Sequence, residues 1–122
     1  MSFRFKEFRV YREAKEYCGF SREVVKGQIE NHDKGLADQI ERALHSIVLN
    51  IAEGSADHSD KEFARFLGIS IRSLYETVAG FDLAAYYGYI RGELNSDIEK
   101  RAHALVKQLA SFRNTLRKQD RA

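Results

Sequence analysis

Apolar residues recur at intervals of three and four positions in four separate stretches of this chain, and that spacing predicts four amphipathic helices. We expect them over residues 6–28, over residues 36–53, from Ser59 to Gly88 and from Ser96 onward. Proline, which breaks helix interiors, is absent from all 122 residues. The sequence therefore predicts an all-α protein, an antiparallel up-down-up-down four-helix bundle that forms one domain over residues 1–122.

Short polar and glycine-containing segments mark the ends of the predicted helices. Residues 30–35 indicate a turn, and Gly54 is a natural C-terminal stop for the second helix. Ser59 is followed three residues later by glutamate, which is the form of a capping box that satisfies the free N–H groups at a helix start. Ser96 repeats this pattern and predicts the first turn of the last helix.

Charged residues are distributed unevenly along the chain. Residues 1–27 hold seven Lys and Arg against four Glu, residues 28–98 hold six against twelve acidic residues, and residues 99–122 hold seven against two, so their net charges are +3, −6 and +5. Segregation of this kind is typical of a surface that faces an anionic partner. It is equally consistent with an acidic middle that neutralises the basic ends within the fold or between subunits. The sequence leaves both interpretations open.

The residue types that bind metals are sparse and poorly spaced. Cys18 is the single cysteine, so the chain can form neither an internal disulfide nor a cysteine-based zinc site, and we expect Cys18 to pack as a small apolar residue. Di-iron sites in helix bundles need glutamate and histidine three residues apart on facing helices. Here the pairs, Glu41 with His45 and Glu99 with His103, are four residues apart. We therefore expect no metal and no cofactor.

Catalytic motifs are also missing. Asp57, His58, Ser59 and Asp60 include the residue types of a catalytic triad, but neighbours in one loop cannot easily form its geometry. There is no Walker pattern for phosphate binding, so we expect a protein that is not an enzyme. Because no stretch approaches the roughly 20 apolar residues that span a bilayer, we also expect no membrane contact and a cytoplasmic location.

A polar stripe runs along the second predicted helix, beside its apolar face. It consists of Gln39, Arg42, Ser46, Asn50 and Glu53, which follow one another at spacings of three, four, four and three. Half-buried polar groups need hydrogen-bond partners, and Ser73, together with Ser70 and Thr77, offers them on the third helix. The stripe is either a structural network that fixes helix register or a surface for a ligand or another subunit. The sequence does not decide between the two.

Basic residues form rows on the outer faces of the last and first predicted helices. The last helix carries Lys100, Lys107, Lys118 and Arg121 with His103 and Asn114, and the first carries Lys15, Arg22 and Lys26. Because the first and last helices of a bundle are usually neighbours, the two rows can merge into one positive patch. Such a patch binds phosphate backbones without reading sequence, and the rows select neither RNA nor DNA. An ordinary solvated helix face is the alternative interpretation.

One segment carries a recognisable pattern. Residues 39–54 read QIERALHSIVLNIAEG, and every fixed position matches the signature QIxRAxxSIxxNIAEG. That signature is typical of the four-helix bundle proteins encoded in 23S rRNA intervening sequences, which this chain resembles. Three further segments resemble the same family, namely residues 63–70 followed by 73–76, residues 88–90 and residues 8–11. The chain departs from the family at Arg72, where glycine usually precedes Ser73.

The resemblance implies an assembly more than an activity. Members of this family associate as ring-like pentamers, so the resemblance implies a homo-oligomer. A related branch, the accessory variability proteins of diversity-generating retroelements, binds a reverse transcriptase and nucleic acid through a basic surface. Two functions follow as expectations: a pentameric bundle that binds nucleic acid, with RNA favoured over DNA, or a scaffold for a protein partner such as a reverse transcriptase.

Overall fold

The regular structure of the chain is helical throughout the part that the structure describes. The computed structural model describes residues 3–56 and 59–121, and only the backbone of residue 121. The elements in chain order are a 3-10 helix η1 (Arg4–Glu7), α1 (Arg9–Val24), a π-helical turn η2 (Val25–Ile29), α2 (Lys34–Gly54), α3 (Asp60–Tyr86) and α4 (Gly92–Arg121). The predicted all-α fold is confirmed.

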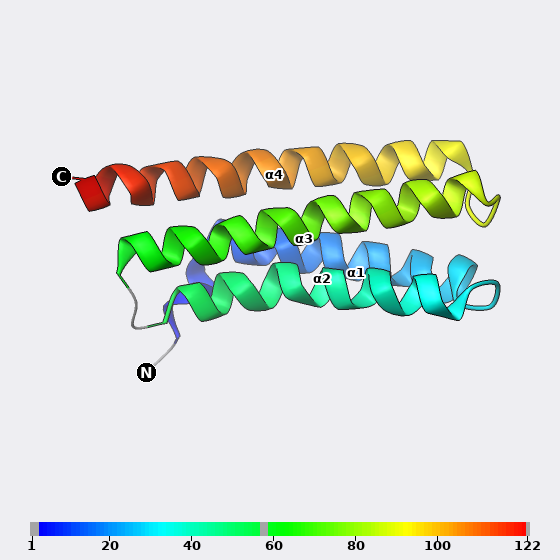
Figure 1. Cartoon of the computed structure of the whole chain (residues 1–122), viewed down its shortest axis with the longest axis horizontal. Coiled ribbons are helices and arrows are strands. Elements are labelled where there is room, and N and C mark those ends of the chain that lie inside the picture. Colours follow the sequence, from blue (N-terminus) through cyan, green and yellow to red (C-terminus); the bar gives the residue numbers. More distant parts are fainter. Residues whose placement is uncertain (1–2, 57–58, 122) are drawn as a thin grey trace.

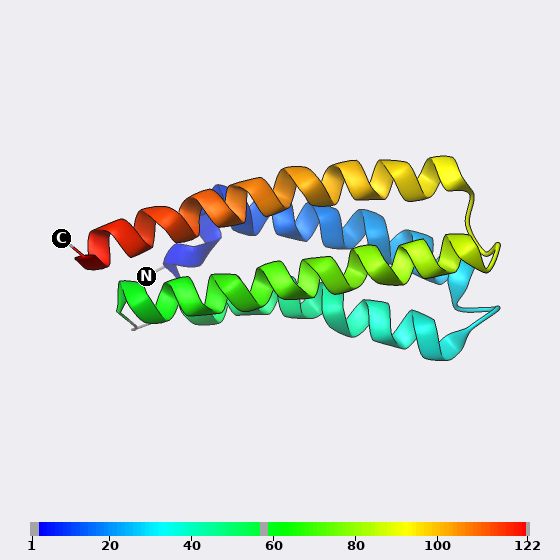
Figure 2. The same cartoon turned by 45° about the horizontal axis from the view of Figure 1, so that its top comes forward.

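The four long helices run antiparallel to their sequence neighbours and form a four-helix bundle (Figure 1). The α1–α2 turn and the α3–α4 turn lie together at one end, and the two termini lie at the other end in both views (Figures 1 and 2). α1 contacts both α2 and α4, and α3 contacts both α2 and α4. The α1–α2 seam and the α3–α4 seam are therefore on opposite sides of the bundle.

The core consists of the apolar stripes that the helical spacing predicted. On α1 it includes Val10, Ala14, Tyr17 and Val24; on α2 Ile40, Leu44, Ile47 and Ile51; on α3 Phe63, Leu67, Leu74 and Phe81; and on α4 Ile98, Ala102, Leu105 and Leu109. Cys18 is half-buried and packs against this core. Arg72, where the sequence departs from the family pattern, is exposed. Within the described residues, no helix combines the length and the apolar character needed to cross a membrane.

One of the two predicted serine caps forms. The Ser59 side chain accepts a hydrogen bond from the backbone N–H of Glu62, at 3.2 Å, so Ser59 caps α3 as expected. Asp57 and His58, the other triad-type residues of that loop, lie outside the described residues. The second box is wrong, because α4 begins four residues earlier, at Gly92.

The early start of α4 has a tertiary cause. The backbone N–H of Asn95 donates to the Arg91 carbonyl at 3.1 Å, which continues the helix upstream of Ser96. The Asn95 side chain donates to Asp82 Oδ1 on α3 at 3.1 Å. Leu94, in this added turn, packs against the core. These contacts stabilise the extra turn upstream of Ser96.

Gly54 ends α2 as predicted, but for a reason that concerns packing. Its backbone does not take the left-handed conformation, since the one positive φ among the described residues belongs to Gly88, at 82°. A Cβ atom at position 54 would lie 2.6 Å from Phe66 Cβ and 2.9 Å from Phe63 Cδ1. The missing side chain therefore allows the end of α2 to approach the start of α3. Gly80 does the same on α3, where a Cβ would lie 2.6 Å from Ile40 Cγ1.

We expect Gly54→Ala to lower the free energy of unfolding by about 1–3 kcal/mol, because overpacking forces backbone shifts. Gly19→Ala is the matched control: a Cβ at position 19 in α1 meets nothing within 4 Å. There the better helix propensity of alanine should raise stability by about 0.5–1 kcal/mol. Urea unfolding of both variants measures the difference, and effects of the same sign would contradict the packing account.

A buried hydrogen bond crosses the core diagonally from α1 to α3. The hydroxyls of Tyr17 and Thr77 are 2.9 Å apart. The Thr77 hydroxyl donates to the Leu74 carbonyl at 2.7 Å, so the Tyr17 hydroxyl donates to Thr77 Oγ1. Burial raises the pKa of the Tyr17 phenol above its ordinary value of 10.0, and the hydrogen bond with Thr77 opposes this only in part. Tyr17 is therefore held as the neutral donor.

We expect Tyr17→Phe to lower the free energy of unfolding at neutral pH by about 1 kcal/mol, the usual contribution of such a bond. Since the folded-state pKa lies above the unfolded value of about 10, this stabilisation is complete below pH 10 and is lost as pH rises through the folded-state pKa. The stability difference between the two proteins should therefore shrink above about pH 10. Urea unfolding at several pH values tests this, and a constant difference would contradict it.

Candidate nucleic-acid interface

Three lysines form an exposed row along the outer face of α4. Lys100, Lys107 and Lys118 are exposed, and their spacings of seven and eleven residues place them on one face of the helix. The opposite face buries Leu105 and Leu109 in the core. None of the three lysines forms an ion pair with any described residue. We call these three residues the α4 lysine row.

Other predicted members of the row add little charge. His103 and Asn114 are exposed on the same face of α4. The backbone of Arg121 continues the helix, but its side chain is outside the described residues. Among the described side chains of this face, the permanent positive charges are therefore the three lysines of the row.

A basic groove adjoins the row at the end of the bundle that holds the termini. The start of α3 and the end of α4 enclose about 490 Å³ there, and the charged lining residues are three cations and two carboxylates: Lys61, Arg65, Arg117, Glu62 and Asp120. Arg65 Nε pairs with Glu62 at 2.7 Å, whereas Lys61 and Arg117 have no ion pair within the described part of the chain. The sequence pattern does not reveal this groove, because its cations come from two helices and are separated by more than 50 residues along the chain.

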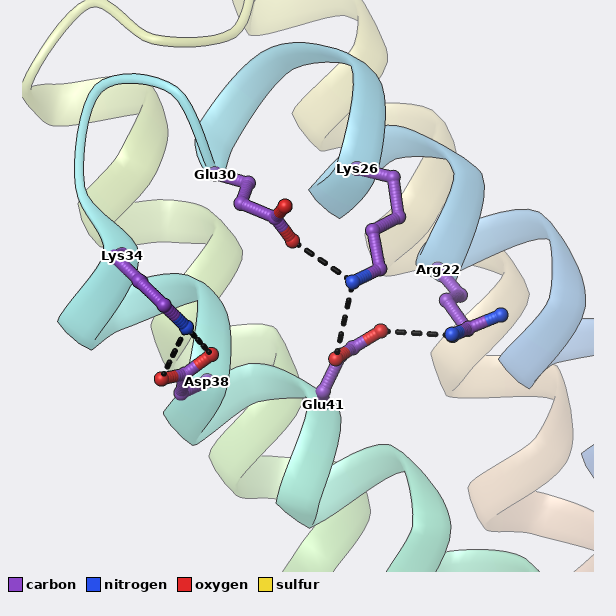
Figure 3. Close-up of polar contacts among 6 residues, drawn as sticks. All are labelled: Arg22, Lys26, Glu30, Lys34, Asp38 and Glu41. Carbon is purple, nitrogen blue, oxygen red and sulfur yellow. Dashed lines mark hydrogen bonds and ion pairs between the residues drawn. The ribbon is translucent and has the colours of Figure 1, made fainter.

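The two basic rows were expected to merge into one patch, but Arg22 and Lys26 of α1 turn away from the α4 lysine row. Figure 3 shows that Arg22 and Lys26 point toward α2, where both approach the carboxylate of Glu41. Arg22 Nε lies 2.7 Å from Glu41 Oε1, and Lys26 Nζ lies 3.7 Å from Glu41 Oε2. Lys26 also pairs with Glu30 at 2.8 Å, and this hydrogen bond raises the pKa of Lys26 above its ordinary value. The acidic middle of the sequence thus neutralises these cations within the fold.

A contact between α1 and α4 also occupies a cation of α4. The Arg101 guanidinium of α4 lies 3.8 Å from the centre of the Phe20 ring of α1. Its Nε is 3.5 Å from Asp97 Oδ2. Lys15 of α1 is exposed, with its ammonium 4.9 Å from the centre of the Tyr11 ring. The seam between α1 and α4 is therefore closed by a cation–aromatic contact and not by a continuous positive patch.

The polar stripe of α2 faces α3, and its central members form a network. Ser46 Oγ lies 2.7 Å from Ser73 Oγ. Asn50 Nδ2 donates to the Ser46 carbonyl at 2.8 Å and to Ser46 Oγ at 3.0 Å. Ser70 Oγ adds a bond to the Ile47 carbonyl at 2.9 Å. These contacts join α2 to α3 at a fixed register.

The outer members of the stripe are not part of this network. Gln39 Nε2 donates to Glu76 Oε2 on α3 at 3.4 Å, and Gln39 is exposed. Arg42 and Glu53 are exposed, and neither forms an ion pair with a described residue. The structural interpretation thus accounts for Ser46, Asn50 and Ser73, and the surface interpretation stays a prediction for Arg42 and Glu53.

Two apolar grooves lie on opposite sides of the bundle. The α1–α2 groove holds about 340 Å³ and is lined in part by Cys18, Val48 and Leu49, of which Leu49 is 62% exposed. Burial raises the pKa of the Cys18 thiol, although nearby Arg22 acts in the opposite direction. The α3–α4 groove holds about 150 Å³ beside Tyr75, which is 64% exposed.

The candidate metal pairs do not converge. Glu41 is held by the α1 cations, while Glu99 and His103 line the α3–α4 groove. Over residues 3–56 and 59–121, no group of three or more His, Cys, Asp and Glu side chains has a geometry that could hold a metal ion.

The bundle thus has a cationic face on α4 whose lysines have no ion pair with a described residue. The signature segment, residues 39–54, ties α2 to α3. The sequence pattern that defines the 23S rRNA-intervening sequence proteins matches residues 6–111, most of the chain. The chain belongs to this family.

A solved structure supports the same placement. It is the crystal structure of a protein of unknown function from the S23 ribosomal protein family of Bacteroides thetaiotaomicron VPI-5482. The two chains are 26% identical and superimpose with a TM-score of 0.76, covering 84% of this chain and 95% of the other. No curated protein matches the chain.

Proposed function

We propose that this member of the 23S rRNA-intervening sequence family is a non-enzymatic, self-assembling bundle that binds RNA through the cationic face of α4. The observation that carries the proposal is the α4 lysine row, which has no acidic partner in the described chain. From Lys100 to Lys118 the row extends over about 27 Å of helix axis, at 1.5 Å per residue. The basic groove around Lys61 and Arg117 lengthens this surface at one end.

An unpaired row of this kind suits a phosphate backbone. Each lysine that neutralises a phosphate releases a condensed counterion, so such binding is strong at low salt and falls steeply as salt rises. Arg22 and Lys26 contribute less, because Glu41 and Glu30 already neutralise them. We choose RNA over DNA because of the family to which the chain belongs.

Filter binding of the purified protein to a structured RNA over a salt series tests the proposal. We expect binding at low salt and a linear fall in the logarithm of the association constant with the logarithm of salt concentration. Absence of binding at low salt, or an affinity that salt does not change, would contradict it.

The two apolar grooves support self-assembly. A ring requires two different complementary surfaces on each copy. Leu49 projects beside the α1–α2 groove, and Tyr75 projects beside the α3–α4 groove on the opposite side. The rims carry opposite charges, with Lys15 at the first groove and Glu99 at the second. We propose that these faces meet in a homopentamer, because the family resemblance implies five subunits. Light scattering tests the assembly, and a monomer at micromolar concentration would contradict it.

The same apolar exposure favours a second candidate function. An accessory subunit that holds a protein partner, such as the reverse transcriptase of a retroelement, would use the exposed Leu49 groove for that partner. Leu49→Lys separates the alternatives. If the groove holds a copy of this chain, the variant loses the oligomer seen by light scattering; if it holds another protein, the oligomer persists and capture of that partner is lost.

A further inference from the structure

Four aromatic rings, three of them exposed and one half-buried, form a cluster at the end of the bundle that carries both sharp turns. Tyr86 and Tyr87 end α3, Tyr89 follows in the α3–α4 turn, and His32 comes from the α1–α2 turn. The ring centres of Tyr86 and Tyr87 are 6.1 Å apart, those of Tyr87 and Tyr89 are 5.6 Å apart, and those of Tyr89 and His32 are 5.3 Å apart. We call these four residues the aromatic end.

Two members of the aromatic end, His32 and Tyr89, have a structural role. The His32 and Tyr89 rings are stacked, with 5° between their planes. The Tyr89 hydroxyl donates to Asp33 Oδ2 at 3.4 Å, and Asp33 Oδ1 accepts from the backbone N–H of Leu36 at the start of α2. Tyr89 thus links the two turns. Because Tyr89 covers one face of the His32 ring, the exposure of His32 lies on its other face and its edges.

The other two members, Tyr86 and Tyr87, have no such role. Tyr86 is 85% exposed and Tyr87 is 52% exposed. Within the described chain, neither hydroxyl makes a hydrogen bond, and the ring–ring contacts of both residues are to other members of the cluster. Single exposed apolar residues are ordinary, but contiguous exposed rings indicate a binding surface.

The surroundings of the aromatic end suit a nucleotide. Arg91 follows Tyr89 in the same turn, is exposed and forms no ion pair with a described residue. Lys100, the first member of the α4 lysine row, stands eight residues beyond the start of α4, about 12 Å along its axis. A strand whose bases contact the rings can therefore place its phosphates near Arg91 and along the row.

We propose that the aromatic end binds unpaired RNA bases by stacking, while the α4 lysine row holds the backbone of the same strand. This inference rests on the proposed function and specifies its ligand as single-stranded RNA. Aromatic side chains bind unpaired bases in this way because every base has a π-face, and each stacked base commonly contributes about tenfold or more in affinity.

The test uses two probes with equal numbers of phosphates, a fluorescent single-stranded oligouridylate and an abasic ribose–phosphate chain of the same length. Fluorescence anisotropy should show that the protein binds the base-bearing probe about tenfold more tightly. The double variant Tyr86→Ala, Tyr87→Ala should reduce this ratio to near one. Tyr86→Phe, which keeps the ring, should retain the ratio, and Phe3→Ala, which removes an exposed aromatic ring at the other end of the bundle, should also retain it.

The possible results distinguish a failure of the stacking inference from a failure of the proposed function. Equal binding of both probes by the unmodified protein, with salt dependence intact, would overturn the stacking inference and leave the proposed function standing; the aromatic end would then be a protein contact. A base preference that survives in the double variant would also overturn it. If neither probe nor a structured RNA binds at low salt, both proposals fail. Circular dichroism of the double variant should be unchanged, because both side chains lie outside the core.

Discussion

Phe63→Ala should lower the free energy of unfolding by about 3–5 kcal/mol, the usual cost of removing a fully buried phenyl ring. Phe63 is 1% exposed, and its ring centre lies 5.9 Å from that of Phe8 and 5.2 Å from that of Phe112. The Arg4 guanidinium lies 5.5 Å from the same ring centre. One side chain thus joins the start of α1, the start of α3 and the C-terminal half of α4.

The loss would be a large part of the 5–15 kcal/mol that stabilises a typical domain. Urea unfolding measures it, and Phe3→Ala is the matched control, since Phe3 is 71% exposed and its removal should change stability by less than about 0.5 kcal/mol. Equal effects of the two substitutions would show that the aromatic contacts around Phe63 do not hold the helices together.

Replacing all three members of the α4 lysine row by glutamine should weaken RNA binding about 100-fold at low salt, because three phosphate contacts and their counterion release are lost together. The fold should not change, since Lys100, Lys107 and Lys118 are exposed and form no ion pair with described residues. Filter binding measures the affinity, and thermal unfolding followed by circular dichroism confirms that the helices remain.

A control triple variant removes the same net charge from cations that acidic residues already neutralise. Arg9, Lys26 and Lys34 each pair with an acidic residue four positions later, at 3.1, 2.8 and 3.1 Å. Such exposed pairs contribute little to stability, so their conversion to glutamine should leave the fold intact. We expect the control to lose far less RNA affinity than the row variant. Equal losses would show that net charge, and not the α4 surface, determines binding.

Periodicity predicted the architecture because each helix hides its own apolar face. The spacing of Ile40, Ile47 and Ile51 on α2 follows from 3.6 residues per turn, and these residues are fully buried as that spacing requires. The capping serine Ser59 also acts locally, through a bond to a backbone N–H three residues away. Features that depend on one segment alone were therefore predictable.

The features of the fold that the sequence did not predict depend on contacts with a second segment. Ser96 has the local form of a cap, but Asn95 reaches Asp82 on α3 and the helix starts earlier. Gly54 ends α2 as expected, but the close approach of Phe63 and Phe66 that its missing side chain allows depends on α3. Neither tertiary contact leaves a signal in the local sequence pattern.

The candidate site shows the same division. Helical spacing placed Lys100, Lys107 and Lys118 on one exposed face, and the structure agrees. Which cations are free could not be predicted, because the carboxylate that binds Arg22 lies 19 residues away on another helix. The π-helical turn Val25–Ile29 and the polar turn that follows it bring α2 back along α1, and this places Glu41 beside Arg22.

The salt dependence of RNA binding tests the central claim most directly, when it is measured for the unmodified protein and for the row variant side by side. The plot of log association constant against log salt concentration should be linear for both. If the α4 lysine row contacts phosphates, the slope of the variant should be shallower by about 2–3, one counterion-release contribution for each lost lysine. Equal slopes would contradict the claim that this face of α4 holds the RNA backbone.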